Sequence, residues 1–439
     1  MKNTVIVVDG GGRGSALVDA YARSPYVYKI IAIPGNDLMA LNAAGKEVVI
    51  HPELKTTSVD EIVAISKRES VALVDVAQDN AVEAGLVDKL REEGIPVVGP
   101  TRLAGQLEWD KAYAREFMKK YSIPHPAFYV FQETGKAIEF IQEQAEQSWV
   151  IKASGLAEGK GVIIAQSREE AIAACEEIKR FGKSGDVFLL EQCLVGEEFS
   201  MYAVSDGTHY QIIGAAQDHK RVGDGDKGPN TGGMGCSTPP LILTPLLTDK
   251  IKTEILDKTF AGLQTEGRPY TGILYLGGMI VQENGHDVPY VIEYNARWGD
   301  PEAEVLLPGV TSDYFTLSAG VARGDITGLD LGLDGKARVA VAGTSKGYPG
   351  DYSAVKGKRI VGLEEAIQAG AKVYGAGIKK NEQGYVANGG RIFYVIGEGA
   401  NVVEARKNAY KVMSKITIEG NNLHYRTDIG WRDVERQMV

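Results

Sequence analysis

The sequence predicts an α/β protein, α+β overall, that begins with a doubly wound parallel sheet and ends with a separate α+β domain. Three observations support this prediction. Short apolar runs alternate with helical patterns through residues 1–101, as expected for strands joined by crossover helices. Strands with a period of two follow at residues 198–215 and 271–295, and the composition changes again after Val310. At roughly 150 residues per domain, the 439 residues suggest about three domains.

The first predicted domain, residues 1–101, begins with a buried strand at residues 4–8 that runs into the glycine turn Asp9–Gly14. A helix is expected at residues 15–23. The remaining strands are expected at 29–33, 48–50, 72–76 and 96–98, and the remaining helices at 60–67 and 81–93.

The second predicted domain, residues 102–325, begins with a helix at 109–121 and includes a lid subdomain at about 122–190. Within that lid we expect strands at 149–153, 161–165 and 187–192 and helices at 135–147 and 168–181. The third predicted domain, residues 326–439, contains the apolar segment 336–344, a strand at 390–396 and a helix at 403–415.

Charge and cysteine content exclude several classes of protein. The net charge is −10, from 48 Lys and Arg against 58 Asp and Glu, and no basic tail is present, so we expect no nucleic-acid partner. Three unpaired cysteines fit a reducing compartment. No apolar run approaches 18 residues, and the N-terminus runs directly into a strand. We therefore expect a soluble cytoplasmic protein without a membrane segment.

Glycine is in excess, and the excess is unevenly placed. The chain has 53 glycines, where an average usage of roughly 7% would give about 31. Thirteen of them lie in three segments, residues 10–14, 155–161 and 218–235. Glycines of this kind form tight turns or allow the backbone to approach a phosphate closely.

The first of these segments partly matches a dinucleotide-binding turn. Gly10 and Gly12 have the required spacing, but Ser15 stands at the third glycine position. The segment is either a plain turn or an anion site at a helix N-terminus, and the adjacent Arg13 favours the anion. A dehydrogenase is disfavoured, because no acidic residue follows the second strand at the ribose-binding position.

The second segment follows the end of an apolar strand, where Lys152 is placed. Gly155 and Gly159 are too close together for a Walker A loop, and Gly161 stands where that loop has Ser or Thr. The segment is either an ordinary glycine hairpin or a loop that folds over a polyphosphate. In the second case backbone amides and the ammonium groups of Lys152 and Lys160 would bind the phosphates.

A strand near residue 295 carries a predicted metal site. Glu293, Asn295 and Arg297 share one face, because side chains alternate along a strand. Carboxylate and amide oxygens suit Mg²⁺, and an arginine next in line suits an anion held by that metal. The alternative, a solvated amphipathic strand, is disfavoured by the apolar neighbours Val291 and Trp298.

The third glycine-rich segment, residues 218–235, has six glycines and almost no apolar side chains, so it cannot pack a core. A loop of that length in a compact chain is functional or disordered. Its mixture of Lys, Arg and Asp favours an ordered loop that contacts a substrate.

Together these segments resemble the ATP-grasp ligases, and the order of motifs is similar to the glycinamide ribonucleotide synthetase (phosphoribosylamine–glycine ligase) family. The stretch Gln217–Gly235 is highly specific for that family, and the resemblance spans nearly the whole chain. Gly277 also agrees, because many other ATP-grasp enzymes have a metal-binding acid there. The other matching segments are 34–36, 99–101, Lys111, 152–162, Glu191, 196–198, 270–280, 292–302, 347–352, 388–391 and 428–432.

The resemblance implies an ATP-grasp fold and an ATP-dependent ligation of glycine to 5-phosphoribosylamine. The reaction would pass through glycyl phosphate and give glycinamide ribonucleotide, ADP and phosphate, a step of de novo purine biosynthesis. It also implies Mg²⁺ (or Mn²⁺) as the metal, and we expect a monomer whose partners are small molecules.

The same resemblance implies a role for particular residues. Glu293 and Asn295 would hold the metal ion, and the catalytic residues would be Arg297, Asp300 and Lys220. ATP would be bound by Lys111, Lys152, Gly159, Lys160, Gly161, Glu191, Leu194 and Glu198. The glycine and amine sites would be formed by Gly11, Gly12, Arg13, Asp218, Asn230, Thr231, Gly232, Gly233, Met234, Gly235 and Glu302.

The chain departs from the family pattern at four places, two of them in the first predicted domain. Gly14-Ser15 stands where Glu-His is usual, and Ala77-Gln78-Asp79 where Gly-Pro-Glu is usual. Ser154 replaces a usual Asp, and Ser237 replaces a frequent Tyr. The acceptor side is thus altered while the ATP side is nearly intact. Two alternatives follow: a related ligase for another amine or amino acid, and a catalytically silent nucleotide-binding regulator, which the intact ATP-side residues disfavour.

Overall fold

The N-terminal part is a five-stranded parallel sheet in the order β3-β2-β1-β4-β5. The computed structural model describes residues 3–157 and 161–438. The strands are β1 Asn3–Val8, β2 Val27–Ala32, β3 Glu47–Ile50, β4 Leu73–Val76 and β5 Val97–Val98. The strand order changes direction between β1 and β4, and in parallel sheets ligands bind beyond the carboxyl ends of the strands at such a point. The turns that follow β1 and β4 therefore border a candidate crevice.

The helices of this part follow the prediction with two differences. α1 begins at Gly12, three residues earlier than expected, and the predicted helix 81–93 is two helices separated at Gly85. Gly85 has a φ of +83°, so the chain cannot continue as one regular helix. The helices are α1 Gly12–Ala22, α2 Val59–Arg68, α3 Asp79–Glu83 and α4 Leu86–Glu92.

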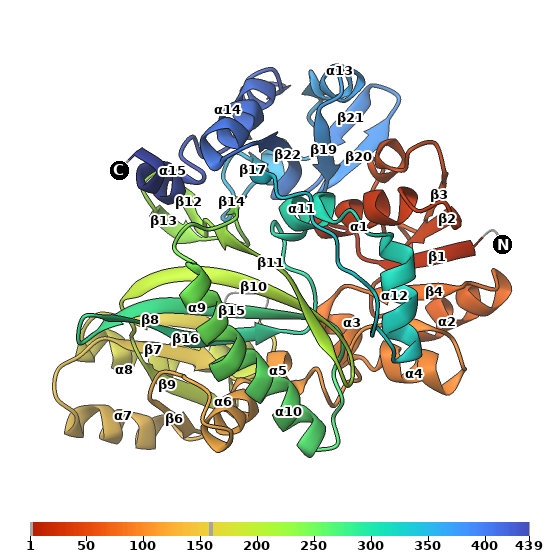
Figure 1. Cartoon of the computed structure of the whole chain (residues 1–439). Helices are drawn as coiled ribbons and strands as arrows, with labels where there is room; N and C mark the ends of the chain where they lie inside the picture. The colour runs from red at the N-terminus through yellow and green to blue at the C-terminus, as the bar shows by residue number, and fades with distance from the viewer. Residues whose placement is uncertain (1–2, 158–160, 439) are drawn as a thin grey trace.

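A second, antiparallel sheet of four strands has the order β6-β9-β7-β8 and lies at the lower left in Figure 1. Its strands are β6 Phe128–Phe131, β7 Trp149–Ala153, β8 Val162–Ala165 and β9 Phe188–Gln192. Helices α7 Thr134–Glu143 and α8 Arg168–Glu177 pack on it through small and apolar side chains such as Ala137 and Ala171. Two further helices, α5 Gln106–Trp109 and α6 Lys111–Lys120, precede this sheet.

The largest sheet is antiparallel and has nine strands. Its order is β16-β15-β10-β11-β14-β17-β22-β19, and β24 also pairs with β17. The bounds are β10 Gly196–Asp206, β11 Tyr210–Asp218, β14 Gly235–Thr238, β15 Thr271–Glu283, β16 His286–Asn295, β17 Ala337–Ser345, β19 Lys372–Gly375, β22 Arg391–Gly399 and β24 Leu423–His424. Ser237 of β14 pairs with Val339 of β17, so residues on both sides of the expected boundary at 325 share one sheet.

The glycine-rich segment 218–235 is a hairpin and not an extended loop. Its strands are β12 Arg221–Gly223 and β13 Lys227–Asn230. Gly225 and Asp226, with φ of +66° and +55°, provide the turn between the two strands. The remaining elements are α9 Pro245–Ile251, a π-helix at Lys252–Leu256, α10 Asp257–Thr265, α11 Ala303–Leu306, α12 Tyr314–Arg323, β18 Ile360–Val361, α13 Leu363–Gln368, β20 Ile378–Asn381, β21 Gly384–Ala387, α14 Val402–Met413, β23 Thr417–Ile418 and α15 Trp431–Met438.

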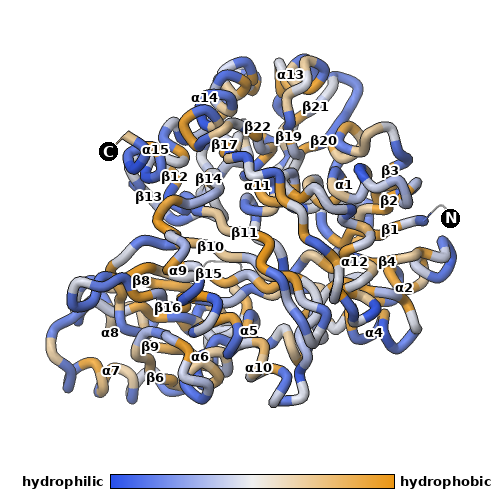
Figure 2. Tube along the Cα trace, in the orientation of Figure 1, coloured by the Kyte–Doolittle hydropathy of each residue, from blue (hydrophilic) through white to orange (hydrophobic). Residues whose placement is uncertain are grey.

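The core joins the two large sheets. Figure 2 shows hydrophobic residues along the sheet strands and hydrophilic ones concentrated in the peripheral turns. One core cluster contains Tyr21 of α1, Tyr202 of β10 and Tyr394 of β22, so the N-terminal sheet packs against the nine-stranded sheet. Within the described residues, no helix is both long enough and apolar enough to cross a membrane.

Candidate active site

A small cavity lies on the nine-stranded sheet, where β10, β11, β15 and β16 meet. Most of its polar lining consists of charged side chains from these strands and from the residues that follow β11. The lining includes Glu198, Ser200, Asp218, Lys220, Tyr275, Ile292 and Glu293. Four of these had been assigned a functional role from the sequence: Glu198, Asp218, Lys220 and Glu293.

Along β16, Glu293 lines the cavity while its neighbour Tyr294 lies on the other side of the strand. Tyr294 points to the opposite face, where its hydroxyl lies 2.6 Å from Thr259 of α10. A β-bulge places Ile292 as an extra residue between the pairs Gly277–Glu293 and Gly278–Val291. β16 therefore presents Glu293 to the cavity.

Glu293 faces several basic side chains. Burial alone would raise the pKa of its carboxyl group, but Lys220 and Lys152 in particular lower that pKa below its usual range. Burial also lowers the pKa of Lys111, and neighbouring Lys152 lowers it further. This concentration of positive charge suits a ligand with several negative charges.

The donor set at this position fits a magnesium ion shared with a phosphorylated ligand. Glu293 supplies carboxylate oxygens and the buried Asn295 supplies an amide oxygen, which are the hard donors that Mg²⁺ prefers. A Cβ atom at Gly277 would lie 3.1 Å from Cγ of Glu293, so the glycine leaves space beside the carboxylate. Over residues 3–157 and 161–438, no group of three His, Cys, Asp or Glu side chains could hold a metal by itself. Mg²⁺ often has only one or two carboxylates together with ligand phosphates.

The four-stranded sheet contributes a buried ion network. Glu191 of β9 accepts Nε and Nη2 of Arg115 at 2.7 and 2.9 Å, and Nζ of Lys152 lies 2.8 Å from its Oε2. Burial would raise the pKa of Glu191, but Arg115 and Lys152 lower it to about 2. Arg115 was not predicted as a site residue, although its place in an amphipathic helix beside buried apolar residues was a usable signal. Glu191 thus orients Lys152, and both of its carboxylate oxygens already accept hydrogen bonds from protein side chains.

The residues around the glycine loop are only partly described. Nζ of Lys111 donates to the carbonyl of Gly155 at 3.3 Å, and a Cβ atom at Gly161 would lie 2.7 Å from that of Ala157. The predicted site residues Gly159 and Lys160 lie outside the described residues. Leu194, also predicted to bind ATP, is half-buried between β9 and β10.

Lys220 and Glu198 form an ion pair at 2.7 Å beside the cavity. Glu302 is buried and accepts a hydrogen bond from Ser200 at 3.0 Å, while Oδ1 of Asp218 has no partner in the described residues. The structure therefore brings these four predicted residues to the same end of β10 and β11.

Arg297 lies beyond the end of β16 and is held by a residue that was not predicted. Its Nη2 lies 3.1 Å from Oε1 of Glu108, whose Oε2 accepts the backbone N–H of Ala296 at 2.7 Å. The Nε atom of Arg297 has no partner in the described residues. A second small cavity is lined by Asp75, Val76, Ala77, Val98, Gly99, Ile273, Ala296, Arg297 and Trp298. Arg297 thus borders the crevice beyond β4 and β5.

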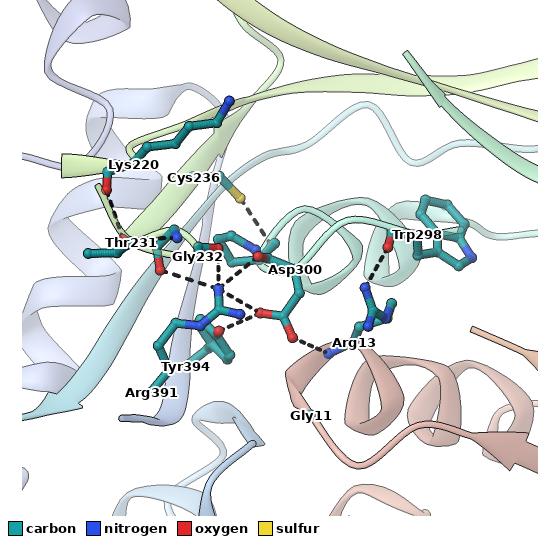
Figure 3. A network of polar contacts seen from close by, with 12 residues as sticks. Gly11, Arg13, Lys220, Thr231, Gly232, Cys236, Trp298, Asp300, Arg391 and Tyr394 are labelled. Carbon is teal, nitrogen blue, oxygen red and sulfur yellow. Dashed lines mark hydrogen bonds and ion pairs between the residues drawn. The ribbon is translucent and has the colours of Figure 1, made fainter. Parts of the chain in front are cut away.

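Asp300 connects three distant segments (Figure 3). Its Oδ1 accepts the hydroxyl of Tyr394 and pairs with Nη1 of Arg391 at 3.1 Å, and its Oδ2 accepts the N–H of Arg13 at 3.3 Å. Arg391 also donates to the carbonyl of Gly232. Arg391 lies in a segment that carries the family resemblance, but neither it nor Tyr394 had been predicted as a site residue.

The turn after β1 is already filled by protein groups. The Arg13 guanidinium is buried and donates to the carboxylate of Asp9 and to the carbonyl of Trp298, at 2.9 and 2.7 Å. The N–H of Gly11 also donates to Asp9, and a Cβ atom at Gly12 would collide with Glu304. Gly11, Gly12 and Arg13, which were predicted to bind substrate, are therefore close-packed at this position.

The predicted substrate segment is ordered by its own hydrogen bonds. Thr231 donates to the carbonyl of Lys220 at 2.8 Å, and the N–H of Gly233 donates to the hydroxyl of Thr231 at 3.0 Å. Met234 is fully buried in the C-terminal core, whereas Asn230 is exposed. The close contacts of Gly232, Gly233 and Gly235 with Arg391, Pro301 and Ala340 leave no room for larger side chains.

The C-terminal segment 424–432 holds this hairpin in place. Arg426 is completely buried and pairs with Asp226 at the hairpin tip at 2.8 Å. Asp428 accepts Nε and Nη2 of Arg426 at 2.7 and 2.8 Å. His219 accepts the N–H of Gly430 at 2.9 Å, and burial together with the charge of Arg426 lowers the pKa of His219 to about 3, so it is neutral.

Comparisons with known proteins agree with this arrangement. The patterns of the phosphoribosylglycinamide synthetase N domain, ATP-grasp (A) domain and C domain match residues 3–108, 109–303 and 338–432. A phosphoribosylamine–glycine ligase from Caulobacter vibrioides is 38% identical over 440 residues, covering 99% of this chain and 100% of the relative. The crystal structure of phosphoribosylamine–glycine ligase from Thermotoga maritima superposes with a TM-score of 0.80 at 32% identity, covering 97% of this chain and 100% of that chain.

A more distant structure shares only the fold. The biotin carboxylase domain of the 2-oxoglutarate carboxylase from Hydrogenobacter thermophilus has a TM-score of 0.69 at 16% identity, covering 96% of this chain and 91% of that chain. The full-length match to curated relatives goes further than the fold. The chain therefore belongs to the phosphoribosylglycinamide synthetase family and is an ATP-grasp ligase.

Proposed function

We propose that this protein ligates glycine to 5-phosphoribosylamine with ATP, giving glycinamide ribonucleotide, ADP and phosphate in purine biosynthesis. One observation carries the proposal: Glu293 and Asn295 lie two residues apart on β16, and basic side chains surround Glu293. Lys220 lines the same cavity as Glu293, Nζ of Lys152 lies 3.3 Å from the carbonyl of the adjacent Ile292, and both lysines lower the pKa of Glu293. Such a site suits a polyphosphate with its metal ion, and the family assignment supports glycine and the amine as the other two substrates.

ATP would lie between the four-stranded and the nine-stranded sheets. Lys111 and Lys152 would neutralise its phosphates, and Glu191 would keep Lys152 oriented through their 2.8 Å ion pair. Leu194 and Glu198 would contact the adenine and ribose. Gly159, Lys160 and Gly161 remain proposed as the loop over the phosphates. Glu293 and Asn295 would hold Mg²⁺ or Mn²⁺, which supplies charge neutralisation at the phosphates when bound.

The chemistry divides into two displacements. A carboxylate oxygen of glycine attacks the γ-phosphorus, the bond to the departing ADP oxygen breaks, and glycyl phosphate forms. The amine nitrogen of phosphoribosylamine then attacks the glycyl carbonyl carbon, phosphate leaves, and the nitrogen loses a proton. Arg297 would stabilise the negative charge of the acyl phosphate, with Lys220 near the transferring group. Positioning and charge neutralisation carry most of such a reaction.

The acceptor and glycine sites would lie around the end of the hairpin. Asp218, Glu302 and the backbone of residues 230–235 would shape them, with Asp300 setting the position of Arg391 and of the α1 turn. We propose further that the protein acts as a cytoplasmic monomer with small-molecule partners and no nucleic acid; its negative charge and three free cysteines support this.

We also propose that residues 1–101, 102–325 and 326–439 are its functional units. Two core clusters support the boundary near residue 101, because one is confined to residues 6–97 and another to residues 104–296. Across the boundary at 325 the units share one sheet, through the pairing of β14 with β17.

The test is ADP release with each substrate omitted in turn. We expect ADP and phosphate only when protein, MgATP, glycine and freshly prepared phosphoribosylamine are all present. Glu293→Gln should abolish release, whereas Glu283→Gln, which changes an exposed acid at the far end of β15, should retain it. Wild-type protein that releases no ADP under these conditions would refute the proposal.

A second candidate is an ATP-grasp ligase that uses another amine or amino acid. The changed residues at 14–15 and 77–79 favour it, because both segments border the crevice between β1 and β4. The same ADP assay, repeated across amino acids and amines, separates the two; turnover with glycine and phosphoribosylamine alone would exclude this candidate.

A further inference from the structure

The carboxylate of Asp9 is the meeting point of both altered segments of the N-terminal part. Asp9 follows β1 and is completely buried. Its Oδ1 accepts the N–H groups of Gly11 and Gly14, the latter at 3.2 Å. Its Oδ2 accepts Nε of Arg13 at 2.9 Å and Nε2 of Gln78 at 2.7 Å. One carboxylate thus binds the turn after β1 and the segment after β4.

Gly14 leaves the space that Asp9 occupies. A Cβ atom at residue 14 would lie 2.7 Å from Oδ1 and 2.9 Å from Cβ of Asp9, and 3.0 Å from Met39. Contacts under 3 Å to a backbone-proximal atom cannot be relieved by rotating a flexible side chain. A glutamate at position 14, usual in the family, therefore excludes the observed Asp9, and Asp9 requires a glycine there.

Gln78 is explained by the same group. The family pattern has a proline at this place, and proline has no side-chain donor. Here the amide of Gln78 gives Asp9 a donor from the opposite side of the crevice. The two departures from the family pattern are consequently one change, a carboxylate supplied from residue 9 together with the partners that it needs.

This network also occupies three of the amides at the N-terminus of α1. Asp9 accepts hydrogen bonds from the backbone N–H groups of Gly11 and Gly14, and Asp300 accepts one from the N–H of Arg13 at 3.3 Å. Free amides at such a place are what binds a phosphate. The Arg13 guanidinium already pairs with Asp9 and donates to the carbonyl of Trp298, so it does not offer a free pair of N–H groups to a phosphate either.

The network ends beside the proposed reacting groups. Trp298, whose carbonyl accepts a hydrogen bond from Arg13, is the next residue after Arg297, and both line the second cavity, at the carboxyl ends of β4 and β5. A shift of Arg13 would therefore move the chain segment that carries Arg297.

We propose that Asp9 is a positioning residue for the acceptor amine, acting through Arg13 and the Gly10–Gly14 turn, and that residues 9, 14 and 78 form one specificity unit. The amine and sugar of the acceptor would bind at the crevice between the turns after β1 and β4, and its phosphate would be bound away from the N-terminus of α1. The identity of the acceptor rests on the proposed function above; the coupling among the three residues does not.

The experiment is a double-mutant cycle at positions 9 and 14. Asp9→Gly removes the carboxylate and the Cβ atom, Gly14→Glu supplies a carboxylate from the other position, and the double variant exchanges them. We expect each single variant to raise KM for the acceptor at least tenfold, with KM for ATP within twofold of wild type. The double variant should return to within about threefold of wild type.

Milder variants keep the test informative if Gly14→Glu does not fold. Gln78→Ala and Asp9→Asn each remove part of the network and should raise the acceptor KM severalfold while ATP binding is retained. Asp60→Asn, which changes an exposed acid of α2, is the matched control. An acceptor KM unchanged in Asp9→Gly, or a double variant no better than the product of the singles, overturns the proposal.

Thermal unfolding separates this result from the proposed function. Even without substrates, the double variant should lose less in its unfolding midpoint than the sum of the two single losses. The reason is that the clash exists only when Asp9 and the Gly14→Glu side chain are both present. If the wild-type protein uses no phosphoribosylamine but the cycle is still non-additive, the proposed function fails and the coupled unit stands.

Discussion

Nη2 of Arg297 lies 3.1 Å from Oε1 of Glu108, and the other oxygen of the same carboxylate accepts the N–H of Ala296. Glu108 thus fixes both the side chain and the backbone of the segment that leaves β16. The helix α5 that carries Glu108 is only four residues long, so its position depends on this contact as much as on its own hydrogen bonds.

Arg297→Ala should lower kcat by 100-fold or more, because a positioned cation at a developing negative charge is worth about 3–4 kcal/mol. Glu108→Gln should lower kcat about tenfold, roughly 1.4 kcal/mol, since Arg297 is kept but loses its partner. Steady-state ADP release with all three substrates measures both. Equal losses in the two variants would show that Glu108 does more than orient Arg297.

Arg115→Gln should destabilise the protein at neutral pH by about 3 kcal/mol, because the pKa of Glu191 would rise from about 2 toward its usual value. The sign follows from the lowered pKa of Glu191. Its carboxylate stabilises the fold at pH values above its pKa in the unfolded chain, and this contribution is lost as the pH falls toward 2. The difference between variant and wild type in urea unfolding should therefore shrink from pH 7 to pH 4. Arg68→Gln, an exposed arginine of α2, is the control and should show no such trend.

Arg426→Gln should release the hairpin β12–β13 before it affects the rest of the protein. The change removes the buried partner of Asp226 and Asp428, but Asp226 keeps its pair with Arg432 and Asp428 keeps the N–H of Gly225. The loss should therefore be below the roughly 3–5 kcal/mol of a fully buried broken pair. Hydrogen exchange of peptides covering residues 221–230 should accelerate, and KM for the acceptor or glycine should rise. Arg323→Gln, at the exposed end of α12, should leave the same peptides protected.

Removal of divalent metal with EDTA should abolish ADP release, and added Mg²⁺ or Mn²⁺ should restore it. Asn295→Ala should raise the Mg²⁺ concentration for half-maximal activity about tenfold or more, because one of two oxygen donors is lost. The thermal midpoint without metal should change little, since the Nδ2 atom of Asn295 has no partner in the described part of the chain. An unchanged metal requirement would remove Asn295 from the proposed site.

Local features of the fold were predictable, and long-range ones were not. The strands around residues 4–8, 149–153 and 271–295 were found because apolar spacing reflects burial along one element. The pairing of β14 with β17 was missed, because residues a hundred positions apart leave no shared local pattern. The sequence predicts a loop at 218–235 rather than this hairpin, since the contacts that hold it come from the distant segment 424–432.

In the candidate site, too, local features were predictable and long-range contacts were not. Glu293 and Asn295 were predicted from strand alternation alone, whereas Glu108, Arg391 and Tyr394 act through partners that are distant in sequence. Two of the four departures also have structural partners. Ser154 joins Asp110 to the first turn of α6, and Ser237 donates to Asp433 of α15 at 2.9 Å.

The shared sheet limits how this protein can be divided or recombined. Gly235–Thr238 has β11 on one side and β17 on the other, so a polypeptide ending near residue 325 would leave its backbone groups on one side unsatisfied. An exposed edge of this kind pairs with other chains and promotes aggregation. The C-terminal part therefore cannot be exchanged by itself: a chimera between relatives would have to carry β14 and β17 from the same parent.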